Sequence, residues 1–403
     1  MKRIVVIHTA DWHLGKNRKH KDYLEQQRLM LSAILALVKD EIVSAEAHDK
    51  INEAETEVWL EVAGDIFDRN EDTDRNEFVL AIISMLAPLL ELERAYPRFK
   101  MDWIDGNHDR QPIDPTDPNA LVSVLSPLTK MVQRECIAVR DPIFMEERSL
   151  LLLPFGHYSE DEFIDLLSEC KAQFVVAHEC LYGITTDTGW KPPRDQDKYI
   201  NIEKVLEACP HLTAIFMGDI HRSQRLDAEG KCWYSGSPIT LDFGEKMPKG
   251  VLIHSFLLDG ESWQRESEPR LQSLLDYEPS LKFHAQLGII EDERKIPMGL
   301  LASYPDRYFR LVVTPEVHDA ISRQLPHFFD SPQVTWDYRK EEITTKAEPD
   351  SSAEDHIDYY RSLIEQWLKE NGSELTREEA VDVMERILKD FSERGVLGVA
   401  TTN

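Results

Sequence analysis

The sequence has few basic side chains for the number of acidic ones. Lysine and arginine together number 46 against 74 aspartates and glutamates, which gives a formal net charge of −28 over 403 residues. Nonspecific binding of nucleic acid relies on Lys and Arg, so the composition argues against a protein that binds DNA through its own net charge. Nucleic acid is not excluded as a ligand, because bound cations change the local sign of a site and a partner can supply a basic surface.

Cysteine and long apolar runs are also scarce. The five cysteines are scattered and include no CxxC pair, which favours a reducing, intracellular setting. We expect Cys180 to pack in the core rather than bind metal. No apolar stretch approaches the length of a membrane span, and the N-terminus shows no secretory signal pattern. These absences predict a soluble cytoplasmic protein without a membrane partner.

Five short apolar runs are present, and each ends in polar residues of types that bind metals. The runs span residues 3–10, 58–63, 101–105, 173–177 and 213–217. Helical patterns lie between or beside them at residues 23–43, 76–92 and 159–170. Runs of this length predict buried strands, and their alternation with helices predicts an α/β fold. Further strand-like pieces at 231–235 and 250–257 suggest a second sheet, and thus a four-layer α/β/β/α body over residues 1–265.

The composition changes beyond residue 260. Residues 260–279 are rich in Glu, Ser and Pro and indicate a break. A small α+β domain is expected at 280–345, from strands at 307–313 and 333–338 and a helix at 316–325. A charged linker and two amphipathic helices follow, forming a helical tail over 353–397. The tail cannot bury its apolar stripes on itself alone, so it either packs back on the body or docks on a partner, and we expect the partner.

Carboxylates, one amide and several imidazoles cluster at the five strand ends, without a thiolate. Ligands of open α/β sheets gather beyond the carboxyl ends of the strands. The candidate metal ligands are Asp11, His13, Asp65, Asn107, His178, Asp219 and His221. Such mixed donors suit Mn²⁺, Mg²⁺ or Fe²⁺, and Zn²⁺ stays open. Two cations that share a bridging carboxylate, for which Asp65 is the natural choice, can activate water against a phosphate.

The same motifs resemble those of a known superfamily. Asp11-x-His13, Gly64-Asp65-x-x-Asp68, Gly106-Asn107-His108-Asp109, His178 and Gly218-Asp219-x-His221 are similar to the signature of the calcineurin-like metallophosphoesterases. The opening phrase from His8 to Gly15 and the turn from Tyr234 to Pro238 resemble the SbcD-type nucleases of DNA repair and recombination. The motifs cover about residues 4–240. The domain over 280–345 and the tail match that family's capping domain and ATPase-binding helices only in order and size.

The resemblance implies a metallophosphoesterase sandwich that acts as a metal-dependent DNA exonuclease and endonuclease with two divalent cations, Mn²⁺ or else Mg²⁺. The implied partners are DNA, a second copy of the chain, and an SbcC-like coiled-coil ATPase on the C-terminal helices. The first cation would be held by Asp11, His13, Asp65 and His221, and the second by Asp65, Asn107, His178 and Asp219. His108 would donate a proton, and Asp68 would orient it. Most relatives have histidine at the position of Asp219, and an oxygen ligand there favours Mn²⁺ or Mg²⁺ over softer ions.

Several alternatives stay open from the residues alone. The chain could be a two-metal phosphoesterase for a phosphoprotein or a small phosphodiester, or a DNA-end-binding scaffold without catalysis. Helix 76–92 is apolar on nearly all sides, and therefore either core or a dimer surface. Arg69 is expected either on a substrate phosphate or on the surface, and Tyr182, Trp190 and Lys191 either on DNA or in a packed loop. We expect structural roles for His8, His157 and His254, and His157 could border the site.

Overall fold

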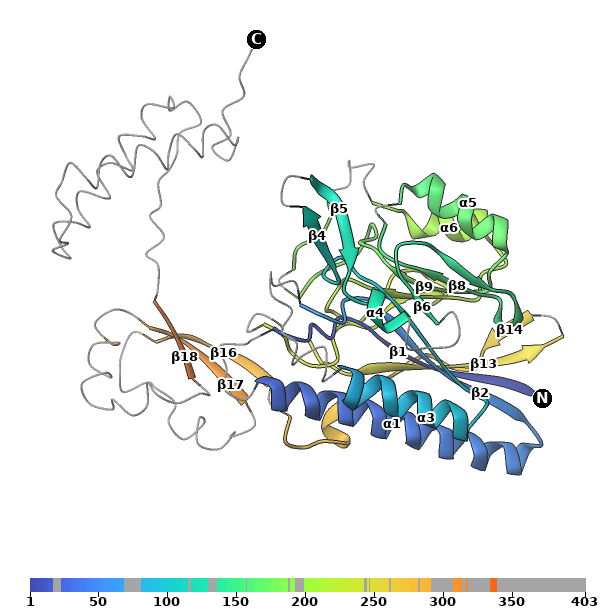
Figure 1. Cartoon of the computed structure of the whole chain (residues 1–403), viewed down its shortest axis with the longest axis horizontal. Helices are drawn as coiled ribbons and strands as arrows, with labels where there is room; N and C mark the ends of the chain where they lie inside the picture. Colours follow the sequence, from blue (N-terminus) through green and yellow to red (C-terminus); the bar gives the residue numbers. More distant parts are fainter. Residues whose placement is uncertain are drawn as a thin grey trace, which may run out of the picture. The chain divides into compact units, whose positions relative to one another are not determined.

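A computed structural model describes residues 1–16, 23–68, 81–114, 117–129, 136–156, 158–187, 189–192, 199–242, 245, 247–260, 262–281, 283–290, 307–313, 317 and 334–338. The chain divides into two compact units, Met1–Arg339 and Lys340–Asn403, and the described residues all belong to the first. They form an α/β protein with two mixed sheets, which confirms the expected α/β class (Figure 1). The expectation that the piece at 250–257 belongs to a second sheet is wrong, because the strand Val251–Asp259 pairs with the N-terminal strand in the first sheet. Arg69, His157, both tail helices and most of the helix expected at 316–325 lie outside the described residues.

The first sheet has the strand order β14-β13-β1-β2-β3-β6, with β15 paired to β13. Its strands are β1 (Lys2–Thr9), β2 (Glu55–Ala63), β3 (Phe99–Ile104), β6 (Ile137–Ala138), β13 (Val251–Asp259), β14 (Ser262–Arg265) and β15 (Arg270–Gln272). β1, β2, β3 and β6 run parallel, and β13 runs antiparallel to β1. The break expected over 260–279 is wrong in part, because β14 and β15 lie within it and pair with β13.

The second sheet has the order β11-β12-β10-β9-β8-β7. Its strands are β7 (Ile143–Met145), β8 (Leu150–Leu153), β9 (Phe174–His178), β10 (Ala214–Gly218), β11 (Gln224–Arg225) and β12 (Cys232–Tyr234). The four inner strands are parallel, and each edge strand is antiparallel to its neighbour. β8 consists of four consecutive buried leucines, as expected for a parallel strand covered on both faces.

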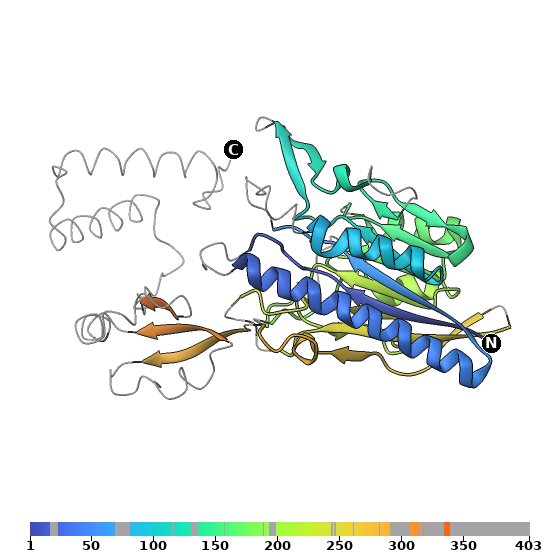
Figure 2. The ribbon, with the colours of Figure 1, turned by 60° about the horizontal axis from the view of Figure 1, so that its bottom comes forward.

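Helices pack on the two sheets and leave a shared layer between them. α1 (Tyr23–Asn52) and α3 (Ala87–Ala95) lie side by side on the first sheet (Figure 2). Their buried residues belong to the same core cluster as Val5 and Ile7 of β1. The intervening residues Ile4 and Val6 belong to another cluster, which they share with strand residues of the second sheet. This alternation follows the two-residue period of a strand. α5 (Glu160–Cys170) and α6 (Ile202–Ala208) join the core of the second sheet.

Local sequence signals explain where the helices begin. Ser159 caps α5 through a capping box with Glu162, which satisfies free N–H groups of the first turn.

The helix expected at 76–92 is described only from Ala81 onward, as a π-helical turn (Ile82–Leu86) that runs into α3. Within it Met85, Leu86 and Leu89 are fully buried in the core of the chain.

The remaining elements are short or stand apart from the two sheets. They are the hairpin of β4 (Arg110–Asp114) and β5 (Asp117–Ser123), α4 (Ser126–Thr129), two 3-10 turns (Glu146–Arg148 and Leu274–Asp276), and a three-stranded sheet of β16 (Phe283–Ile290), β17 (Arg307–Val313) and β18 (Val334–Tyr338). That sheet is parallel in the order β16-β17-β18, which confirms the two strands expected there and adds β16. Among the described residues, no helix combines the length and apolarity required to cross a membrane.

Two histidines are buried in the layer between the sheets, as expected for structural residues. His8 of β1 hydrogen-bonds the Met217 carbonyl at 3.1 Å, and Arg265 contacts the His254 ring at 2.9 Å. Burial lowers the pKa of His8 to about 3 and the pKa of His254 well below its usual value. In the unfolded chain both rings titrate near 6.5. The unfolded state therefore binds protons that the folded state excludes once the pH falls below that value.

Lowering the pH is therefore expected to destabilise the folded state, because the two rings take up protons only when the chain unfolds. The free energy of unfolding should fall by roughly 1.4 kcal/mol per pH unit for each ring, from about pH 6 down towards pH 3. Urea unfolding at a series of pH values measures this slope. A His8→Asn variant removes one titrating group and should show a slope smaller by about one proton. An identical slope in the variant and the wild type would contradict this explanation.

Candidate metal centre

The seven candidate ligands lie at the carboxyl ends of five parallel strands. Asp11 and His13 follow β1, Asp65 follows β2, Asn107 follows β3, His178 ends β9, and Asp219 and His221 follow β10. Asp11, His13, Asp65 and Asp219 have φ values of 55°, 45°, 53° and 96°. Left-handed backbone costs a non-glycine residue about 1–3 kcal/mol, and such strain concentrates at functional sites. The loops after β1 and β2 are held together by hydrogen bonds from Asp11 N to Gly64 O and from His13 N to Asp65 O, both 3.0 Å.

Three glycines allow these loops to approach closely. A Cβ atom on Gly64 would overlap the His178 ring, one on Gly106 would overlap the Asp65 carboxylate, and one on Gly218 would overlap the Ala63 carbonyl. Gly64 also has a φ of +84°, which L side chains rarely adopt. The glycines of the three Gly-Asp and Gly-Asn motifs are therefore required by contact with the site itself, beyond their ordinary use in turns.

Hydrogen bonds fix which nitrogen of His178 faces the site. Its Nδ1 lies 2.7 Å from the Ala63 carbonyl, an acceptor, so Nδ1 carries the hydrogen. Its Nε2 points at three oxygens: Asn107 Oδ1 at 3.0 Å, Asp65 Oδ1 at 3.3 Å and Asp219 Oδ1 at 3.9 Å. A bare nitrogen facing three oxygen acceptors is unfavourable unless a proton or a cation lies among them. Metal-binding histidines typically have one ring nitrogen facing the metal site and donate the N–H of the other to a carbonyl or carboxylate. His178 has this arrangement, with Nδ1 held by the Ala63 carbonyl.

His13 and His221 repeat the arrangement on the other side of Asp65. His13 Nδ1 lies 3.2 Å from Asp68 Oδ1, and His221 Nδ1 lies 2.8 Å from Glu245 Oε1. Both Nδ1 atoms therefore carry hydrogen, and the two Nε2 atoms face each other at 3.1 Å. Two lone pairs at this distance need a proton or a cation between or beside them. The second oxygen of Asp11 is also buried and has no hydrogen-bond partner among the described residues, so the donor set fits a cation here.

Asp65 lies between the two groups of ligands. Its Oδ1 accepts a hydrogen bond from the His108 backbone N–H at 2.9 Å and faces His178, while its Oδ2 lies 3.5 Å from His13 Nε2. The ligand atoms of Asp11, His13 and His221 lie within 4.8 Å of one another, as do those of Asp11, Asp65 and His178. Buried histidine and aspartate groups could thus hold metal ions on both sides of Asp65.

The two candidate catalytic residues lie at the edge of this cluster. The His108 side chain is 33% exposed, and its Nδ1 lies 3.6 Å from Asp68 Oδ1. Asp68 is closer to His13, to which it is hydrogen-bonded at 3.2 Å. Asp68 therefore supports a candidate ligand as well as facing His108. His108 is more exposed than the ring of His13, which is 1% exposed, so it can meet a substrate.

Electrostatics within the site reflect its burial. Burial raises the pKa of Asp11 to about 6 and raises the pKa of Asp219, while it lowers the pKa of His13 to about 4. Burial is the largest single influence on Asp65 and opposes its ionisation, but the charge and hydrogen bond of His178 together with the charges of His13 and His108 outweigh it and lower the pKa of Asp65. The carboxylates thus compete for positive charge in a buried space, and a divalent cation would satisfy them together.

Two carboxylates that support the site were not among the candidates. Asp109 accepts hydrogen bonds from the backbone N–H groups of Ile66, Phe67 and Gly106 at 2.8–3.2 Å, and so joins the loops after β2 and β3. The sequence signal that could have identified Asp109 was its position next to His108 in the motif. Glu245 lies 24 residues beyond His221, and neither motif nor spacing points to it.

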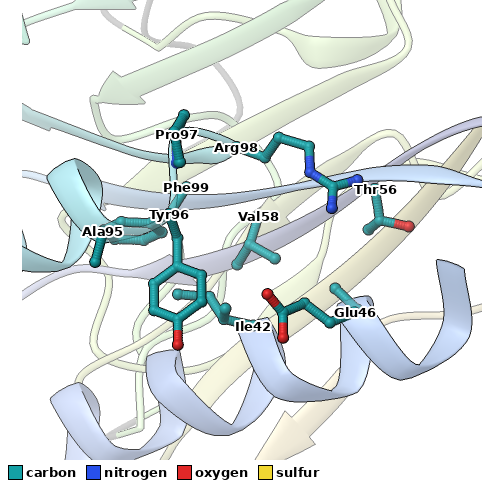
Figure 3. Close-up of a pocket in the computed structure, with 10 residues that line it drawn as sticks. Ile42, Glu46, Thr56, Val58, Ala95, Tyr96, Pro97, Arg98 and Phe99 are labelled. Carbon is teal, nitrogen blue, oxygen red and sulfur yellow. The ribbon is translucent and has the colours of Figure 1, made fainter. Parts of the chain in front are cut away.

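Cys180 and Trp190, which the sequence also singled out, lie against the core of the second sheet and in a loop, respectively. Cys180 packs against the core of the second sheet, as expected. Trp190 is 48% exposed in a loop held by a hydrogen bond from Thr186 N to its carbonyl. A pocket of about 180 Å³ is lined by Ile42, Glu46 and Phe99 among others. Its lining includes residues near the start of β2 and of β3 (Figure 3). The candidate ligands that these two strands provide follow their other ends.

No known protein-family model matches the chain. The site consists of three imidazoles whose Nε2 atoms face one another or oxygen atoms, three carboxylates and an amide oxygen, at the carboxyl ends of the strands.

Proposed function

We propose that this protein is a two-metal phosphodiester hydrolase that cleaves DNA, the nuclease subunit of an SbcCD-like repair and recombination complex. The observation that supports it best is that His13 Nε2 and His178 Nε2 each face one oxygen of Asp65, while His221 Nε2 lies 3.1 Å from His13 Nε2. The order of the motifs along the chain, which is similar to that of the SbcD-type nucleases, supports DNA as the substrate.

The fold proposed with this function is a four-layer metallophosphoesterase sandwich over residues 1–265. Packing of α1 and α3 on one sheet, and of α5 and α6 on the other, supports that arrangement. A capping domain over 280–345 would contact DNA, and the parallel sheet of β16, β17 and β18 lies within that range. The helical tail over 353–397 would bind the coiled-coil ATPase. A homodimer belongs to the same proposal.

The residues would divide the chemistry among them as follows. Asp11, His13 and His221 would hold one divalent cation, Asn107, His178 and Asp219 would hold the other, and Asp65 would contribute to both. Mn²⁺ is proposed first and Mg²⁺ second; two such cations, when bound, neutralise a phosphate and lower the pKa of a water molecule. His108 donates a proton to the leaving oxygen from its partly exposed ring. Asp68 holds the His13 ring and faces His108.

The acidic composition suits this assignment of roles. A chain with a net charge of −28 repels the phosphate backbone of DNA at long range. Cations at the site reverse that sign locally, and an ATPase partner would contribute the remaining surface. Binding of DNA without the partner is therefore expected to be weak and dependent on metal.

The substrate class is tested by presenting two substrates to the purified chain. With Mn²⁺ we expect cleavage of hairpin DNA and no release of phosphate from a phosphopeptide, because the proposed site is completed by DNA-contacting elements beyond residue 280. EDTA should stop the cleavage, since the two cations supply the water nucleophile. Gel electrophoresis and phosphate release are the measurements. Turnover of the phosphopeptide alone would overturn the nuclease assignment.

A further inference from the structure

A buried charged network lies on the outer side of His221. It consists of Glu245, Lys249 and Asp187, whose side chains are 6%, 2% and 4% exposed. Lys249 Nζ lies 2.9 Å from Asp187 Oδ2, 3.2 Å from Glu245 Oε2 and 2.6 Å from the His221 carbonyl. All three contacts are made with oxygen acceptors, so the ammonium group is fully paired.

Each oxygen of Glu245 has a separate partner. Oε1 accepts from His221 Nδ1 at 2.8 Å, and Oε2 accepts from the Leu241 backbone N–H at 2.8 Å. A carboxylate held at both oxygens cannot rotate to follow the ring. The ring instead must keep the orientation, and the Nδ1–H tautomer, that the carboxylate sets.

The network also fixes the backbone of the same residue. Lys249 binds the His221 carbonyl, while Glu245 binds its ring. His221 is thus restrained at main chain and side chain by two groups that contact each other. Burying charged groups is unfavourable by several kcal/mol unless they are well paired. If these residues served only to fill the core, apolar side chains would do so without that penalty.

We propose that Glu245 and Lys249 are positioning residues for His221, and that they set the affinity of the Asp11, His13 and His221 side of the centre for its cation. This rests on the part of the proposed function that assigns metal binding to these residues, and does not depend on DNA as the substrate. Outer hydrogen-bond partners of metal-binding histidines typically change metal affinity by about 10–100-fold when they are replaced.

The test is Mn²⁺ binding to the full chain, measured by titration with electron paramagnetic resonance detection of free Mn²⁺. In Glu245→Gln we expect one of two binding steps to weaken by about 10–100-fold, while the other stays close to wild type. Lys249→Met should weaken the same step. Glu160→Gln is the matched control, because Glu160 also pairs with a lysine, at 2.6 Å, and a backbone N–H, at 2.9 Å, far along the chain from His221.

A second measurement needs no variant in the network. Histidine-selective ¹⁵N NMR of the metal-free wild type at alkaline pH, assigned with His221→Gln, should show His221 protonated on Nδ1 and bare on Nε2. The opposite tautomer, or equal Mn²⁺ affinities in Glu245→Gln and the wild type, would overturn the inference and leave the metal centre in place. Failure of the wild type to bind Mn²⁺ at all would overturn both. Mn²⁺ binding without DNA cleavage would remove the proposed substrate only.

Discussion

Replacing Asp65 with asparagine is expected to lower the rate of DNA cleavage by about 10³-fold or more, the largest effect of any single change in the site. Each Asp65 oxygen faces a different group of candidate ligands, so the substitution removes charge from both sides at once. Metal ions contribute several kcal/mol of charge stabilisation to phosphoryl chemistry, and about 4 kcal/mol corresponds to a factor of roughly 10³. Steady-state cleavage of hairpin DNA and Mn²⁺ titration measure the two consequences.

Asp165→Asn is the matched control for this change. It removes the same charge from an exposed position on α5 and should leave both measurements unaltered. Asparagine at position 65 can still accept the hydrogen bond from the His108 backbone N–H, so thermal unfolding should confirm a folded variant. A folded Asp65→Asn protein with wild-type cleavage would exclude Asp65 as a bridging ligand.

Replacing His108 with glutamine is expected to lower kcat by about 10²–10⁴-fold, the usual contribution of a positioned general acid. Mn²⁺ affinity should stay within about twofold of the wild type, because His108 is a proton donor in this account and not a ligand. Its side chain is 33% exposed, and its Nδ1 lies 3.6 Å from Asp68 Oδ1. Cleavage kinetics and Mn²⁺ titration of the same preparation separate the two properties.

His48→Gln offers a close control for that variant. His48 is 29% exposed, and its Nδ1 lies 3.7 Å from an aspartate, Asp49, much as His108 lies 3.6 Å from Asp68. It belongs to α1, whose residues are not among the candidate ligands, and it should cleave DNA at the wild-type rate. If His108→Gln lost metal and activity together, His108 would be a ligand, and the proton donor would have to be sought elsewhere.

Much of the fold could be predicted because its strands are continuous apolar runs. β1, β9 and β10 were expected within a residue or two of their bounds, since strands covered on both faces contain few polar residues. β4 and β5 were missed, and the proline within each explains why, because proline argues against a paired strand. α1 was expected to end at Val43 but continues to Asn52. In this extension the apolar residues no longer mark one buried face, and Ile51 is 80% exposed.

The candidate ligands could be located in the sequence because each lies at the end of a strand or within four residues beyond it. Placement at strand ends fixes which residues meet, and the structure brings all seven to one edge. The tautomers of His13, His178 and His221 could not be predicted, because they depend on acceptors far away in the chain: Asp68, Ala63 and Glu245. Periodicity and local spacing carry no signal for contacts of this kind, which tertiary packing alone creates.

Anomalous scattering from crystals soaked in Mn²⁺ tests the central claim most directly. We expect two peaks on opposite sides of the Asp65 carboxylate, roughly 3.5–4 Å apart, one near the Nε2 atoms of His13 and His221 and the other near that of His178. Crystals that diffract well but show no manganese within coordinating distance of Asp65 would contradict the account.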